Sequence, residues 1–198
     1  MATKSIFAAE LLLFAAQVVA MSTLAQNSKA ADAASTRSDQ SMSATQQSSA
    51  VLMNVSPKSF ATQAAVMGKA EVELAQLALD KSKNADVRAY AQRMVEDHSA
   101  TNANLKKLAS QENITLPSAL DAEHQAVKQK LSGLQGDDFD RQYTQEMASG
   151  HEKAVAFFQS ATQSPQMPQE FKEFAATALS TLEDHREQAQ QLVNKTRS

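Results

Sequence analysis

The sequence predicts an all-α protein: an antiparallel four-helix bundle with a short extra helix in the crossover between its two hairpins. Glycine and proline are scarce, with four of each among 198 residues, so little in the chain interrupts helices. Four long segments repeat apolar residues at steps of three and four, the spacing of an amphipathic helix. The tripeptide Glu-Asp-His ends at His98 in one segment and at His185 in another, which indicates two copies of one helical hairpin.

The composition excludes several classes of function. The chain contains no cysteine, which rules out disulfides, thiolate metal sites and cysteine nucleophiles. The formal net charge of −3 gives no reason to expect nucleic-acid binding, which is typical of basic surfaces. No apolar run reaches the length of a membrane span. We therefore expect neither a nucleic-acid partner nor a transmembrane span in the mature chain.

Residues 1–25 are typical of a secretory signal peptide. Lys4 is the charged start, Leu11–Ala20 is a short apolar core, and Thr23–Ala25 is a small-residue cleavage site. Glu10 places a negative charge beside the core and would also fit the amphipathic helical start of a cytoplasmic protein. We favour the signal peptide, which predicts a periplasmic or extracellular location after cleavage.

Residues 26–57 are predicted to form a disordered linker. This stretch is rich in serine, alanine, glutamine and threonine and contains no aromatic residue. It cannot bury enough apolar surface to offset the entropy lost on ordering. The folded domain is then expected to span residues 58–196.

The first hairpin is predicted from two apolar stripes. One helix is expected over residues 58–83, with Ser56 or Ser59 as its cap. A tight turn begins at Asn84, and the second helix follows to about Gln111. Because the connection is short, the two helices should be antiparallel neighbours.

The second hairpin follows a crossover that contains a short helix. That helix is expected over residues 119–131, where it carries a surface histidine at position 124. The third long helix should run from a cap at Asp137 or Asp138 to about Ser164. The fourth is expected over residues 169–196.

Four polar residues occupy positions where these stripes call for apolar ones. They are Glu71, His98, His151 and His185, one from each long helix. With a rise of about 1.5 Å per residue, each lies roughly 20–25 Å from its own interhelical turn. All four should therefore meet in one layer in the middle of the bundle, either around a metal ion or in a hydrogen-bonded ion network.

Several stretches resemble a known bacterial family. They read GKAEVELAQLALDKSKNADVRAYAQRMVEDH, NLKKLASQENITLP, GDDFDRQYTQEMASGHEKAVAFF and LEDH, and the resemblance covers about residues 59–193. The family is called domain of unknown function 4142. It implies a ferritin-like fold and export from the cytoplasm, and no agreed activity goes with it. Its pattern picks out Glu71, Asp97, His98, Asp140, Tyr143, His151 and His185.

A di-iron centre of the ferritin type is not expected. That centre needs a glutamate three residues before each of two histidines. Val95 stands three residues before His98, and Leu182 three before His185. What remains is one mononuclear site for Zn, Cu, Ni or Fe, since imidazole and carboxylate suit all four metals. Its expected ligands are Glu71, His98, His151 and His185.

Four further residues are expected to support these ligands without binding the ion. Asp97 and Asp184 each precede a histidine, so they point about 100° away around the helix, either toward the ligands or to the surface. Asp140 and Tyr143 lie roughly two to three turns before His151. They could instead tie the third helix to the crossover.

The alternative to a metal site is a network of ion pairs. Glu71 would pair with His98, and Asp140 or Asp184 would lie near the other two histidines. In that case the folded pKa values of His98 and His185 would be raised. Their stabilisation would then be complete below about pH 6.5 and would fade at higher pH.

The sequence leaves three functions open. The chain is either an exported, non-catalytic envelope or stress protein with a buried Glu/His core, or a mononuclear metal-binding or metal-dependent redox protein. A third possibility is a protein-interaction module that uses its Ala/Gln-rich outer faces. No catalytic residue is predicted, because the sequence has no phosphate-binding glycine loop, no nucleophile elbow and no clustered acid pair.

Overall fold

The computed structural model describes residues 55–197, which form only helices and connecting segments. The expected signal peptide at 1–25, and all but the last three residues of the expected linker at 26–57, lie outside this range. The helices are α2 (Pro57–Lys81), α3 (Ala85–Gln111), α4 (Ala122–Ser132), α5 (Gly136–Gln163) and α6 (Gln169–Thr196). The all-α prediction is confirmed. Within residues 55–197, every helix is too short or too polar to cross a membrane.

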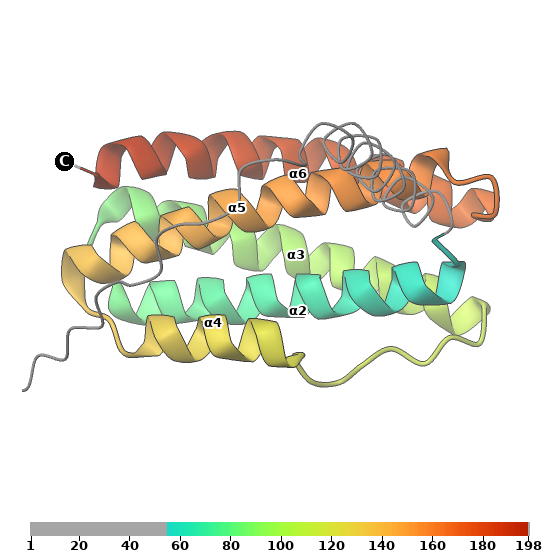
Figure 1. Ribbon diagram of the computed structural model, residues 1–198, viewed down its shortest axis with the longest axis horizontal. Helices are drawn as coiled ribbons and strands as arrows, with labels where there is room; N and C mark the ends of the chain where they lie inside the picture. Colours follow the sequence, from blue (N-terminus) through green and yellow to red (C-terminus); the bar gives the residue numbers. More distant parts are fainter. Residues whose placement is uncertain (1–54, 198) are drawn as a thin grey trace, which may run out of the picture. The chain divides into compact units, whose positions relative to one another are not determined.

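Four long helices lie side by side as two antiparallel hairpins (Figure 1). One hairpin is α2 with α3, and the other is α5 with α6. Between the hairpins, α3 packs against α6 and α2 packs against α5. The crossover from α3 to α5 contains α4, which packs against α2 and α5. Each long helix therefore has one face toward a shared interior.

Side-chain caps fix the starts of three helices. Ser56 accepts a hydrogen bond from the Ser59 amide, and Asn84 accepts from the amides of Asp86 and Val87. Asp121 accepts from the amide of His124 at the start of α4. Each cap satisfies amides that have no partner within the first turn of a helix.

The predicted cap of α5 is wrong. Asp137 and Asp138 lie inside its first turn, where their negative charges interact favourably with the positive end of the helix dipole. The helix begins after Gln135, which makes no capping hydrogen bond. Gly136 has a φ of 54°, a left-handed conformation open to glycine at little steric cost, and this places the start of α5 before the two aspartates.

The core consists of two apolar clusters on either side of a polar layer. One contains Phe60, Leu105, Ala154 and Leu182 among its buried residues. The other contains Leu74, Met94, Met147 and Ala189. Every long helix passes from one cluster to the other, and Glu71, His98, His151 and His185 lie at the four crossing points.

Candidate metal centre

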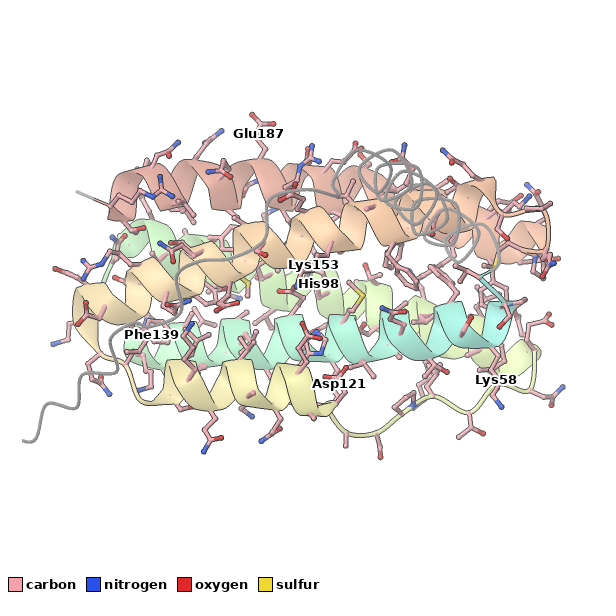
Figure 2. The ribbon with its side chains drawn as sticks, viewed as in Figure 1. Lys58, His98, Asp121, Phe139, Lys153 and Glu187 are labelled. Atoms are coloured by element: carbon pink, nitrogen blue, oxygen red, sulfur yellow. The ribbon has the colours of Figure 1, made fainter. Side chains whose placement is uncertain are left out.

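Three buried histidines meet in the polar layer. His98 comes from α3, His151 from α5 and His185 from α6. One ring nitrogen from each lies within 4.8 Å of one from each of the others. The ring centroids are 5.2 to 5.5 Å apart. Figure 2 labels His98, which lies about midway along α3.

Hydrogen bonds fix the tautomers of two of these rings. Nδ1 of His151 lies 2.9 Å from the carbonyl oxygen of Met147, so this nitrogen carries the hydrogen and donates it. Nε2 of His185 lies 2.9 Å from Oδ2 of Asp97 and likewise donates. In the neutral form of either ring, the opposite nitrogen therefore keeps a free lone pair.

The free nitrogens are buried and have no hydrogen-bond partner among residues 55–197. They are Nε2 of His151 and Nδ1 of His185, and Nε2 of His98 is also buried and unpaired. His98 is 6% exposed and the other two are 0% exposed. Leaving one buried polar group unsatisfied costs about 1–3 kcal/mol. Three such atoms in one cluster call for a shared partner.

Burial keeps two of the imidazoles neutral. Desolvation lowers the pKa of His98 well below 6.5, and the neighbouring His151 and His185 add to the effect. Desolvation also lowers the pKa of His185, although Asp97 opposes this by stabilising the charged ring. The raised pKa values expected for an ion-pair network are therefore not found. No carboxylate of residues 55–197 acts on His98, and burial outweighs the effect of Asp97 on His185.

Glu71 lies beside the histidines but is paired differently from the prediction. Its Oε1 lies 4.0 Å from Nδ1 of His151, and within residues 55–197 it makes no ion pair with His98. It faces the His151 nitrogen that donates to Met147, and it is not among the three residues whose ligand atoms converge. Burial raises the pKa of its carboxyl, which favours the neutral acid.

The two aspartates of the repeated tripeptide have different surroundings. Asp97 accepts from His185 and also from Nε of Arg93 at 3.2 Å, so it holds the His185 ring in place. Asp184 is mostly exposed, with 61% of its side chain accessible, and pairs with Arg93 at 3.5 Å. Within the described part of the chain it makes no ion pair or hydrogen bond with a histidine side chain, so the pairing suggested for it is wrong.

Asp140 and Tyr143 are buried on α5 on one side of the histidine layer, and Tyr143 belongs to the apolar cluster that contains Met147. The ring of Tyr143 stacks on Phe139 with centroids 5.9 Å apart, and it lies beside Tyr90. Oδ1 of Asp140 and the Tyr143 hydroxyl have no hydrogen-bond partner in the part of the chain that the structure describes. Neither makes an ion pair or hydrogen bond with a histidine within residues 55–197.

Three contributors were not expected from the sequence. The carbonyl of Met147 orients His151, the Tyr90 hydroxyl donates to the backbone carbonyl of His185 at 3.3 Å, and Arg93 pairs with Asp97. Only Arg93 carried a signal in the sequence, because it stands four residues before Asp97 on one helix face.

Comparison with known proteins identifies the family. The profile described as domain of unknown function DUF4142 matches residues 41–192. The chain belongs to the DUF4142 family. The resemblance inferred from the motifs is thus confirmed, and the DUF4142 match begins before α2. A comparison with functionally curated proteins finds no match.

Two solved structures share the fold of this DUF4142 chain. One is a DUF305 protein from Streptomyces coelicolor that is described as a candidate secreted protein. Its TM-score is 0.62 and its sequence identity is 17%, and the match covers 72% of this chain and 95% of that one. The other is a DUF305 fragment from Deinococcus radiodurans, with a TM-score of 0.63 at 17% identity, covering 71% and 97%. At this identity the likeness concerns the fold alone.

Proposed function

We propose that this DUF4142 protein is exported and binds one transition-metal ion through His98, His151 and His185. Two observations carry the proposal. One ring nitrogen from each of three buried histidines lies within 4.8 Å of the others. Each of these histidines also has a buried ring nitrogen without a hydrogen-bond partner in residues 55–197. A metal ion would accept all three lone pairs at once and remove their desolvation cost.

The hydrogen bonds behind the histidines favour this reading over a purely structural polar layer. Metal-binding histidines almost always donate their other ring N–H to a carboxylate or a backbone carbonyl. His185 donates to Asp97 and His151 donates to the carbonyl of Met147. A structural network would be expected to satisfy the remaining nitrogens, and here they are left free.

The protonation states also suit a metal site. Metal ions compete with protons for imidazole nitrogens, so a ring that stays neutral is available at lower pH. Burial lowers the pKa of both His98 and His185. Imidazole ligands suit Zn, Cu, Ni and Fe, and three histidines with an open fourth position form a known zinc arrangement.

Export rests on two observations of a different kind. Residues 1–25 have the charged start, apolar core and small-residue site of a signal peptide. One structural neighbour is described as a candidate secreted protein. We therefore propose that the bundle acts in the periplasm or outside the cell, at the end of the linker predicted for residues 26–57.

Metal analysis of protein purified without a histidine tag tests the metal site. We expect about one ion per chain in the wild type. His98→Ala, His151→Ala and His185→Ala should each lower the metal affinity by more than about 100-fold. The reason is that substituting even a residue that only hydrogen-bonds to a metal ligand lowers metal affinity by about 10–100-fold. His124→Ala is the matched control, because this ring lies outside the cluster and bonds Asp121. Circular dichroism checks that each variant stays helical.

Two results would overturn the metal proposal. One is wild-type protein that remains metal-free when supplied with Zn, Cu, Ni and Fe(II). The other is metal bound equally well by the three cluster variants and by His124→Ala.

A further inference from the structure

A small, partly enclosed cavity borders the histidine layer at His98. It has a volume of about 30 Å³ and is lined by residues of α2, α3, α5 and α6, including Glu71 and His98. On the other side of the layer, Met94, Met147 and Tyr143 are almost completely buried and fill the space. Among the three clustered histidines, His98 borders this cavity.

Small residues from all four long helices create this cavity. They are Ala64 and Gly68 on α2, Ala154 on α5 and Ala178 on α6, with Thr101 on α3. Protein cores are close-packed and contain few voids larger than a water molecule. A void of this size has room for about two water-sized groups. Its position beside an incomplete set of ligands calls for an explanation.

Two polar residues of the cavity wall carry buried polar atoms that have no hydrogen-bond partner within residues 55–197. His98 is 94% buried, and its Nε2 has no partner. Glu71 also lines the cavity, and its Oε2 is buried and unpaired. A ligand in the cavity could therefore bind an ion held by the histidines and at the same time contact the Glu71 carboxyl.

We infer that this cavity holds the fourth ligand of the ion, a small exogenous molecule of two or three atoms at most, of the size of water, dioxygen or azide. The inference rests on the proposed metal site and extends it. Three protein nitrogens leave one position of a tetrahedral ion open, as in sites that bind a water or substrate. The cavity size would exclude larger molecules.

Glu71 marks a route by which such a ligand could reach the cavity. It lines both the cavity and a second hollow of about 170 Å³, which is formed by residues of α2, α4 and α5. His124 and Glu123 lie at the α4 side of that hollow. A small molecule entering there would pass the Glu71 carboxyl before it reached His98.

Azide binding to the Co²⁺-loaded protein tests this inference. Co²⁺ serves as the spectroscopic ion, and visible absorption reports both metal binding and azide binding. We expect azide to bind at one per ion in the wild type. In Ala178→Leu the added side chain fills the cavity, so Co²⁺ should bind at one per chain while azide affinity falls at least tenfold. Ala176→Leu is the matched control, since Ala176 is exposed on the same helix.

A second pair of variants covers the case in which Ala178→Leu does not fold. Ala154→Val fills the cavity from α5 with a smaller side chain, and Ala156→Val makes the same change at an exposed position of that helix. The expected result is again azide loss in the first variant and not in the second.

The possible failures are distinguishable. Co²⁺ bound at one per chain with no azide response, or with equal azide affinity in the filled and control variants, would overturn the fourth-ligand inference and leave the metal site standing. If Co²⁺ does not bind to the wild type, the metal site fails and this inference fails with it.

Discussion

His98 and His185 are neutral because they are buried in the central layer, which lowers the pKa of each ring. The rings of His151 and His185 are completely buried and that of His98 is nearly so. Charging a ring in this environment would require removing a cation from water, a cost that one nearby carboxylate does not offset. Asp97 therefore orients His185 but does not raise its pKa above the usual value.

The stability of the metal-free protein should fall as the pH drops below about 6.5. The pKa values of His98 and His185 are lowered in the fold, so the unfolded chain takes up protons there while the folded chain does not. The contribution of these histidines to the free energy of unfolding is therefore complete above pH 6.5. Below it, the free energy declines by about 1.4 kcal/mol per pH unit for each such histidine, until the folded pKa is reached. Urea unfolding between pH 7.5 and 5.0, in the presence of a chelator, measures this slope.

His98→Asn provides the comparison for this pH dependence. The substitution removes one titrating ring. The decline of unfolding free energy per pH unit should therefore be smaller than in the wild type, by up to the contribution of one bound proton. The same slope in the variant and the wild type, or wild-type stability that rises as the pH falls from 6.5, would show that His98 is not held neutral.

The candidate histidines could be predicted from sequence, and their pairing could not. Each lies on an apolar stripe, and counting residues from the turns placed them at one level. Counting gives height along a helix but not the rotation of one helix against another. Because α2 packs against both α3 and α5, Glu71 could face His98 or His151, and it faces His151.

Helix ends are set by local chemistry and differ in how well the sequence reveals them. The bounds of α6 agree with the prediction, because proline and a long apolar stripe mark them. α4 begins at Ala122 and not at 119, because Asp121 caps it. The start of α5 was missed because it depends on the left-handed conformation of Gly136, which stripe periodicity does not report.

The cap at Asn84 should contribute measurably to stability. Its Oδ1 accepts from the Asp86 amide at 2.9 Å and from the Val87 amide at 3.3 Å. Asn84→Ala leaves these amides without a side-chain partner and should lower the free energy of unfolding by about 1 kcal/mol. For a domain of this size that corresponds to a melting temperature lower by about 2–4 °C.

Lys83→Ala is the control for the cap, since it alters an exposed residue of the same turn. It should change the melting temperature by much less. Equal effects of the two substitutions would mean that the turn itself, and not the Asn84 side chain, holds the start of α3.

At the scale of the bundle, the histidine layer joins two hairpins. His98 belongs to the α2–α3 hairpin, and His151 and His185 belong to the α5–α6 hairpin. An ion held by all three would cross-link the hairpins at the middle of the bundle, between the two apolar clusters. The ligand set exists only when the hairpins are docked, so binding of the ion and docking of the hairpins should be coupled.

Metal should therefore stabilise the whole fold. With free metal at 100 times its dissociation constant, the gain is about 2.7 kcal/mol, or about 5–10 °C in melting temperature. Thermal unfolding with added metal and with a chelator measures the difference. His98→Ala should abolish it, because both remaining ligands then lie on one hairpin, whereas His124→Ala should retain it. A shift of equal size in both variants would mean that the ion binds elsewhere, and the two hairpins would then be held together by apolar packing alone.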